Sequence, residues 1–252
     1  MPRRALISTV AALSLLASVA TLAHASARAQ LTVFAAASLT GVLPQIDPAE
    51  RYSFGGSNTL AAQIQQGAPA DVFASANTSL PAQLFARNLC TRPVVFTRNA
   101  LVVVVPAPNP RGIRSVFDLA KDGVKLVIAG PGVPVGGYTL QVLAQMNLSD
   151  AVLKNVVSRE TDVREVLSKV ALGEGDAGFV YATDARTARG KVKVIKVPAW
   201  AEPKVQYAMC VVTAGAHRSD AQAFVNRVLS RSGQAKLVAA GFLPRVKATS
   251  KK

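Results

Sequence analysis

The sequence predicts an α/β protein of two lobes, with a mixed, largely parallel sheet in each lobe. Short apolar runs typical of buried strands alternate with helical patterns along most of the chain, and this alternation is typical of parallel sheets covered by helices. Two strand-like runs, at 101–106 and 205–214, enclose the middle of the chain. If both cross between domains, the chain leaves one lobe, builds a second and returns, as in hinged two-lobe proteins.

The first half of the chain is expected to begin with a buried strand, LTVFAA, and then to alternate between helices and strands. Leu60 and Ile64 lie one turn apart on a helix that ends at Gly67. The expected strands are 31–36, 51–54, 71–75 and 93–106, the last split near 97–99, and the expected helices are 39–46, 57–66 and 79–88.

The second half continues the alternation. The helix that starts at Thr161 or Asp162 has the clearest signals, with Glu165 in its first turn and Gly173 at its end. Strands are expected at 124–130, 155–160, 177–181, 192–197 and 205–214, and helices at 115–121, 135–146, 161–175 and, as a pair, within 221–241.

The first 27 residues are predicted to be a cleaved signal peptide. Arg3 and Arg4 precede the apolar run 5–23, and the segment ending at Ala27 fits a small-x-small cleavage pattern. A membrane anchor is the weaker alternative, because serine and threonine dilute a run of marginal length. No cysteine near the cleavage site could accept a lipid, which favours a soluble periplasmic protein. Removing 27 residues from 252 leaves 225, ample for a sizeable core.

The net charge of +15 includes two arginines in the signal, so the mature chain carries about +13. Nucleic acid is the first partner that such a charge suggests. However, the basic residues are dispersed and aromatic residues make up 6% of the chain. We therefore expect no nucleic-acid binding, and a polyanion-binding protein remains an alternative. A dispersed positive charge also attracts small anions.

Cysteine and histidine are scarce. Cys90 and Cys210 lie 120 residues apart; export permits a disulfide, but two separately buried thiols are the favoured interpretation. Cleavage of the signal leaves His217 as the sole histidine. A zinc site or a Ser-His-Asp triad is therefore not expected. An exported α/β hydrolase is a further alternative, although a G-x-S-x-G nucleophile elbow is not visible.

Small and hydroxyl residues occur repeatedly where an expected strand runs into a helix. In open α/β sheets, ligands bind beyond the carboxyl ends of strands, and helix N-termini bind anions through free backbone N–H groups. Each stretch alone is more typical of an ordinary helix cap or a tight turn than of a ligand site. Their combination and order favour an oxyanion site. The stretches are AAASLT (35–40), GGSNTLA (55–61), SANTS (75–79), ETDV (160–163) and VYATD (180–184).

Together these stretches resemble the periplasmic molybdate-binding proteins, the substrate-binding components of molybdate ABC importers. The resemblance runs from Leu31 to Pro244 and is most specific in GGSNTLAAQIQQGAPADVF and GEGDAGFVYATDA. It implies a type II periplasmic binding protein with a ligand cleft between two lobes and a hinge of two crossing strands. We expect lobe 1 to comprise 28–104 and 210–252, and lobe 2 to comprise 105–209.

The resemblance also implies how the ligand is held. Molybdate, and tungstate as well, would be bound through its oxygens by neutral groups, with no metal cation, no cofactor and no catalytic step. The donors implied are the hydroxyls of Ser38, Ser57 and Tyr181 and the backbone N–H groups of Ala76 and Val163. A receptor for another tetrahedral oxyanion, such as sulfate, is the closest alternative. The expected partner is an inner-membrane ABC permease, and the protein is expected to be a monomer without stable membrane insertion.

The chain departs from the family between Thr40 and Tyr52. The family has a longer first helix and linker there, whereas this sequence has GVLPQIDPAER, with prolines at 44 and 48. The five ligand positions are unaffected. The short segment puts in question the packing beneath Ser38 and the stiffness of the hinge.

Overall fold

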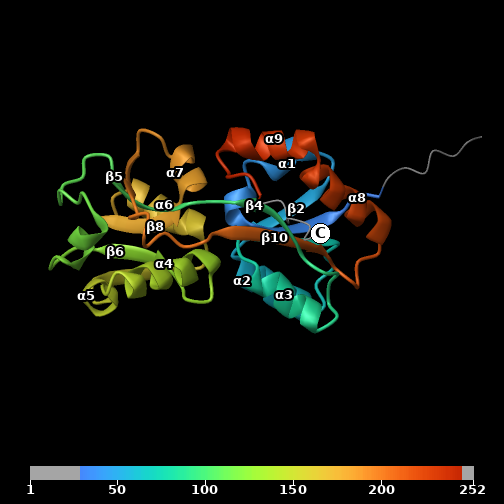
Figure 1. Cartoon of the computed structure of the whole chain (residues 1–252), viewed down its shortest axis with the longest axis horizontal. Coiled ribbons are helices and arrows are strands. Elements are labelled where there is room, and N and C mark those ends of the chain that lie inside the picture. Colours follow the sequence, from blue (N-terminus) through green and yellow to red (C-terminus); the bar gives the residue numbers. More distant parts are fainter. Residues whose placement is uncertain (1–28, 246–252) are drawn as a thin grey trace, which may run out of the picture.

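A computed structural model describes residues 29–245 of the chain. The predicted signal peptide at 1–27 lies outside the described residues. Two five-stranded sheets, each covered by helices, form two lobes that lie end to end along the longest axis of the molecule (Figure 1). The predicted fold class is therefore confirmed: the protein has the type II two-lobe architecture of periplasmic binding proteins.

Lobe 1 is built on a sheet with the strand order β2-β1-β3-β10-β4. Strand β1 pairs in parallel with β2 and β3, whereas β10 runs antiparallel to both of its neighbours. The sheet is thus mixed but mostly parallel. Its strands are β1 (Thr32–Ala36), β2 (Arg51–Gly55), β3 (Val72–Ser75), β4 (Val94–Arg98) and β10 (Gln206–Val211).

Helices cover both faces of this sheet. In Figure 1, α2 and α3 lie on one face, and α1, α8 and α9 lie on the other. The faces are apolar because the strands are short buried runs such as VFAS in β3. The helical elements are η1 (Ala37–Leu39), α1 (Leu43–Ile46), α2 (Ser57–Gln65), α3 (Ser79–Ala86), α8 (Arg218–Leu229) and α9 (Arg231–Ala240).

Lobe 2 repeats the plan, with the strand order β7-β6-β8-β5-β9. Here β5 is the antiparallel strand, and β6 pairs in parallel with β7 and β8. The strands are β5 (Leu101–Pro106), β6 (Leu126–Ala129), β7 (Val156–Glu160), β8 (Ala177–Tyr181) and β9 (Val192–Lys196). The helical elements are η2 (Val116–Ala120), α4 (Pro134–Gln145), α5 (Ser149–Leu153), α6 (Val163–Ala171) and α7 (Ala182–Thr187).

Most expected elements are present, with differences at short helices. The helix expected at 115–121 is a 3₁₀ helix that starts after the capping residue Ser115. The turn expected after β8 is the helix α7, and α5 has no counterpart among the expected elements. Helices of five or six residues contain too few turns to leave a periodic pattern of apolar residues.

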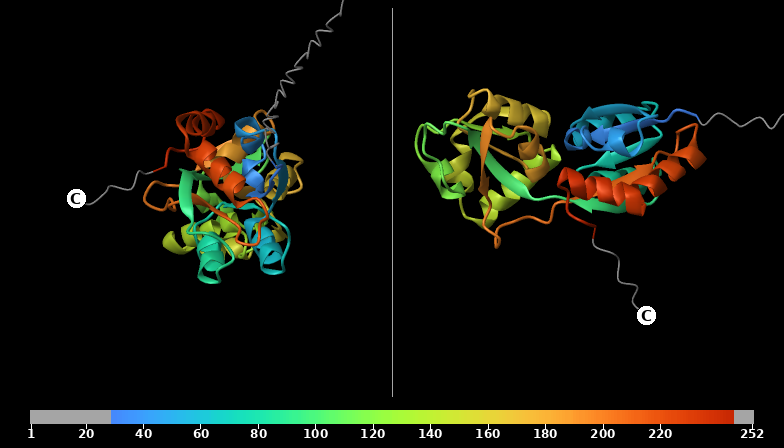
Figure 2. Two further views of the ribbon diagram at one scale, coloured as in Figure 1. Left: turned by 90° about the vertical axis from the view of Figure 1, so that its right-hand side faces the viewer. Right: turned by 90° about the horizontal axis from the view of Figure 1, so that it is seen from above.

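The two crossings between the lobes lie outside the strands that were expected to form them. Strand β5 pairs entirely within lobe 2 and β10 within lobe 1. The crossings are therefore the segments at 99–100 and 197–205, and the boundaries predicted at 104/105 and 209/210 are wrong by most of a strand. The two crossings lie side by side, and the Asn99 N–H donates to the Val205 carbonyl (3.1 Å). The right-hand view of Figure 2, seen from above, shows the two lobes and the crossings that join them.

Ion pairs and apolar contacts support the shortened segment between β1 and β2. Arg227 of α8 places its Nε 2.7 Å from Asp47 and its Nη2 3.5 Å from Glu50. Glu50 in turn accepts a hydrogen bond from the Leu31 backbone (2.7 Å). These ion pairs lie near Leu31, at the start of β1. Buried residues of η1 and α1, including Leu39 and Leu43, belong to the main core cluster, so the short segment is packed at both of its ends.

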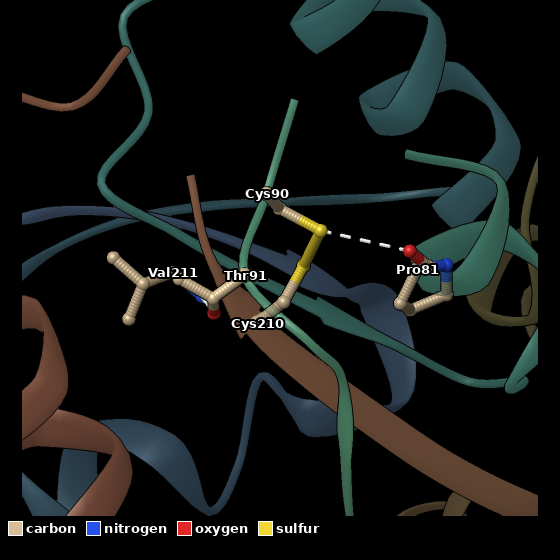
Figure 3. Close-up of a disulfide and its surroundings, with 5 residues drawn as sticks. All are labelled: Pro81, Cys90, Thr91, Cys210 and Val211. Carbon is tan, nitrogen blue, oxygen red and sulfur yellow. Dashed lines mark hydrogen bonds between the residues drawn. A yellow bond between two sulfur atoms is a disulfide. The ribbon is translucent and has the colours of Figure 1, made fainter. Parts of the chain in front are cut away.

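Cys90 and Cys210 form a disulfide within lobe 1 (Figure 3). Their Cα atoms are 5.9 Å apart. The segment after α3 runs beside β10, where the Thr91 N–H donates to the Val211 carbonyl (2.8 Å). The prediction of two separate buried thiols is therefore wrong: both residues are buried, but long-range strand pairing brings them together.

Candidate functional site

One small cavity lies between the two lobes, and all five predicted site residues line it. Its volume, taken as the space open to the centre of a water molecule, is about 10 Å³, enough for one small polar group. We call it the interlobe cavity. It is lined by Ala36, Ala37, Ser38, Gly55, Gly56, Ser57 and Ala76 of lobe 1 and by Val133, Pro134, Val135, Asp162, Val163 and Tyr181 of lobe 2.

The serine hydroxyls of lobe 1 do not cap the helices on which they lie. The N-cap residues of η1 and α2 are Ala36 and Gly56, whose side chains offer no acceptor. Ser38 and Ser57 occupy positions inside the first turn and are buried. The alternative interpretation of both serines as ordinary helix caps is therefore excluded.

Ser57 is oriented by the end of the neighbouring strand. The backbone N–H of Ala76, just after β3, donates to the Ser57 Oγ (3.1 Å). Because the oxygen accepts this bond, the hydroxyl proton of Ser57 is left for an acceptor in the cavity. The amide of Ala76, which was expected to bind the ligand directly, is already engaged. Ala76 lines the cavity, but its amide orients Ser57.

Ser38 has a comparable arrangement with a different partner. Its Oγ lies 2.9 Å from the hydroxyl oxygen of Tyr207 in β10. Both residues are buried, at 5% and 0% exposure. Each serine of the cavity therefore has its oxygen in contact with a donor-bearing group of lobe 1.

Lobe 2 presents backbone N–H groups at the start of α6. Asp162 caps this helix, as predicted, and its Oδ1 accepts from the N–H groups of Arg164 (2.7 Å) and Glu165 (3.1 Å). The cap therefore satisfies the second and third amides of the helix, whereas Val163 is the first. Its N–H is left beside the cavity that Val163 lines.

The start of α4 provides a further backbone N–H donor that was not predicted from the sequence. Pro134 occupies the first helical position and has no N–H, so Val135 carries the first free amide of this helix. Both residues line the interlobe cavity. Gly136 allows the first turn of α4 to pack closely against the backbone of Gly130, because a Cβ on Gly136 would lie 2.1 Å from the Gly130 carbonyl oxygen. The glycine pair at 136–137 resembles the pair at 55–56 that precedes α2, and this repeat in the sequence could have indicated a second donor site.

Tyr181 contributes a buried hydroxyl from the end of β8. Its side chain is 1% exposed, and within residues 29–245 its hydroxyl has no hydrogen-bond partner. Burial and then the nearby Tyr207 and Tyr138 raise its pKa well above 10, so it stays protonated. A buried polar group without a partner is costly, and a bound acceptor in the cavity would satisfy it.

None of the residues that line the cavity is a lysine, arginine or histidine. The one charged residue that lines it, Asp162, uses its Oδ1 to accept from the Arg164 and Glu165 N–H groups. Arg164 also forms an ion pair, in which its Nε lies 3.1 Å from the Oδ1 of the buried Asp184. Burial raises the pKa of Asp184 to about 7, against the opposing effect of Arg164. The cavity therefore offers neutral donors at the N-termini of several helices, an arrangement that stabilises anions.

The two lobes meet at the mouth of the cavity. A Cβ on Gly56, the N-cap residue of α2, would lie 2.3 Å from the carbonyl oxygen of Thr161 in lobe 2. Real Cβ contacts are never so short, so only glycine allows the backbones to approach this closely. The structure therefore has the lobes in contact around the cavity.

Two α/β lobes, two adjacent crossings and an interlobe cavity lined by helix N-termini define a two-lobe solute-binding protein. The family model described as bacterial extracellular solute-binding protein matches residues 31–243, and the chain belongs to this family. No helix in the described range is long and apolar enough to cross a membrane.

Named relatives and solved structures resemble the chain over most of its length. The molybdate-binding protein ModA of Mycobacterium tuberculosis is 36% identical over 222 residues, covering 84% of each chain. The periplasmic molybdate-binding protein of Azotobacter vinelandii superposes with a TM-score of 0.77 at 24% identity, over 86% of this chain and 100% of that one. The sulfate-binding protein SubI of M. tuberculosis superposes with a TM-score of 0.76 at 20% identity, over 88% of each chain.

Proposed function

We propose that this protein captures molybdate, and tungstate as well, outside the cytoplasm and delivers it to an ABC permease. The observation that carries the proposal is the convergence of neutral donors from both lobes on one cavity. These donors are the hydroxyls of Ser38, Ser57 and Tyr181 and the amides of Val135 and Val163. The relative that is 36% identical is a molybdate-binding protein by name, which supports molybdate as the ligand.

The donors bind the oxyanion without a formal cation. Each hydrogen bond to a charged acceptor contributes about 1.5–3 kcal/mol, and the N-termini of α2, α4 and α6 add their positive dipole ends. Desolvating a dianion is costly, so both lobes must coordinate it together. Molybdenum enters as molybdate and is held through its oxygens.

Because the donors are fixed in space, the distance between them selects the size of the anion. Molybdate has longer bonds from its central atom to oxygen than sulfate. The alternative of a sulfate receptor has the support of a common fold with SubI, but at 20% identity that likeness concerns the fold alone. Sulfate would leave some of the donors of Ser38, Ser57, Val135, Val163 and Tyr181 out of reach.

The protein acts, in this proposal, as a soluble monomeric receptor in the periplasm and performs no chemical step. The family is one of extracellular solute-binding proteins, and the predicted signal peptide at 1–27 supports export. The partner is an inner-membrane permease, which would recognise the closed, loaded form. The dispersed positive charge of the chain would draw oxyanions towards the protein.

Calorimetric titration of the mature protein with molybdate, tungstate, sulfate and phosphate tests this function. We expect one anion per protein, with molybdate and tungstate bound much more tightly than the other two. Tight sulfate binding together with weak molybdate binding would establish the alternative receptor. Absence of binding by all four anions would exclude an oxyanion receptor of this kind.

A further inference from the structure

Asn99 occupies a buried position where the chain first crosses between the lobes. Its side-chain Oδ1 accepts a hydrogen bond from the Ala100 N–H (3.0 Å). Its Nδ2 lies 2.8 Å from the Thr183 Oγ1 of lobe 2 and 3.3 Å from the Tyr207 hydroxyl oxygen of lobe 1. The side chain is thus connected to both lobes at the crossing and is 4% exposed.

These contacts orient the Asn99 end of a chain of hydrogen bonds that leads to the cavity. Because the Oδ1 of Asn99 accepts a backbone N–H, the amide cannot be turned over without losing that bond, and Nδ2 must be the donor to Tyr207. The oxygen of Tyr207 then accepts from Nδ2. The 2.9 Å contact between the two hydroxyls allows either to donate, and the Ser38 Oγ is the acceptor that the described residues place within reach of the Tyr207 proton. Ser38 accepts this bond, and its own proton is left for the interlobe cavity.

Tyr207 is suited to this role because its ring is held on several sides. Edge-to-face contacts join it to Phe96, Tyr181 and Phe242, with ring centroids 5.5–6.2 Å apart. Burial, followed by the nearby Asp184, raises its pKa well above 10. The hydroxyl therefore keeps its proton at physiological pH and is always available as a donor.

We propose that Asn99 and Tyr207 are positioning residues that make Ser38 a dedicated donor to the bound oxyanion. This inference rests on the proposed function and assigns roles to two residues that do not line the cavity. The Ala76 amide has the same effect on Ser57 in a single step. In both cases the protein occupies the serine oxygen, so the serine can only donate to the ligand.

A double-mutant cycle separates this role from a structural one. Tyr207→Phe keeps the ring and removes the donor to Ser38, so we expect the Kd for molybdate to rise about five- to tenfold. In a Ser38→Ala background, the same change should raise the Kd less than about twofold, because Tyr207 acts through Ser38. Asn99→Ala provides a second variant if Tyr207→Phe folds poorly; it also removes the bonds to Thr183 and to the Ala100 N–H, so its effect should shrink, but not vanish, in the Ser38→Ala background.

Tyr52→Phe is the matched control. Its hydroxyl donates to the Leu43 and Asp47 carbonyls, away from the cavity, and its loss should leave the Kd unchanged. If the wild type binds molybdate and Tyr207→Phe raises the Kd by the same factor in both backgrounds, this inference alone is overturned. If the wild type binds no molybdate, the proposed function is overturned, and with it the positioning role of Asn99 and Tyr207.

Discussion

The two lobes share a sheet topology but offer different kinds of donor to the interlobe cavity. Lobe 1 provides side-chain hydroxyls, Ser38 and Ser57, whose oxygens contact Tyr207 and the Ala76 amide. Lobe 2 provides chiefly backbone amides at helix starts, with Tyr181 as its hydroxyl. The difference implies that substitutions in lobe 1 remove donors, whereas most substitutions in lobe 2 leave the donor in place.

The lobes also differ in what stabilises them. Lobe 1 contains the disulfide between Cys90 and Cys210 and the ion pairs of Arg227. Lobe 2 contains a fully buried carboxylate, Asp184, which has Arg164 as its ion-pair partner. Lobe 1 therefore has covalent reinforcement, while lobe 2 holds an ionisable group whose charged form is disfavoured by burial.

The largest effect on binding is expected where the lobes touch. Gly56→Ala would place a Cβ against the Thr161 carbonyl oxygen, which a closed structure cannot accommodate. We expect the Kd for molybdate to rise about a hundredfold or more, and small-angle scattering to show a more open protein in the presence of ligand.

Gly41→Ala is the control for this change. It adds the same methyl group in lobe 1, where no heavy atom lies within 4 Å of the new Cβ. Its Kd should match that of the wild type. If Gly56→Ala also bound like the wild type, the contact between the lobes would not be part of the ligand-bound form.

The disulfide should affect stability rather than binding. Replacing Cys90 and Cys210 together by serine opens a loop of 120 residues and should lower the free energy of unfolding by about 2–5 kcal/mol. The bond lies in the apolar cluster on the α2 and α3 side of the sheet, so the Kd for molybdate should change little. Urea unfolding and calorimetry measure the two effects, and a large loss of affinity would contradict the separation.

Ser57→Ala and Val163→Ala compare the two kinds of donor directly. The first removes a hydroxyl and should raise the Kd about ten- to a hundredfold. The second keeps the backbone N–H and should raise the Kd less than about threefold, although the smaller core residue lowers the melting temperature. Equal losses of affinity would show that the Val163 side chain, not its amide, matters for binding.

The smallest effect concerns pH and lobe 2. Burial raises the pKa of Asp184 from 3.8 to about 7, so between these values the folded protein binds more protons than the unfolded chain. Its contribution to stability is therefore present at low pH and is lost as pH rises towards 7. Asp184→Asn should flatten the dependence of unfolding free energy on pH between 5 and 7; an unchanged slope would contradict the assignment.

Periodicity in the sequence predicted the two-lobe α/β class and most elements, because buried strands and helices leave local patterns. It could not locate the crossings. The runs at 101–106 and 206–211 are apolar on both faces and would suit either sheet, and only their pairing with β8 and β3 decides. The disulfide depends on the same kind of long-range pairing.

Within the site, hydroxyl donors were easier to predict than amide donors. Ser38, Ser57 and Tyr181 have a characteristic residue type at the ends of strands, and all three line the cavity. Amide donors leave no such signature, since any residue except proline carries one. This is why Val135 was missed, and why the amides of Ala76 and Val163 were expected as donors only through the family resemblance; the Ala76 amide donates to Ser57 instead.

A crystal structure of the molybdate complex, with anomalous data collected at the molybdenum edge, tests the central claim most directly. We expect one anomalous peak in the interlobe cavity, with anion oxygens within hydrogen-bonding distance of the Ser38, Ser57 and Tyr181 hydroxyls and of the Val135 and Val163 amides. The Ala76 amide should still donate to Ser57. A peak outside the cavity, or an anion bound by one lobe alone, would contradict the account.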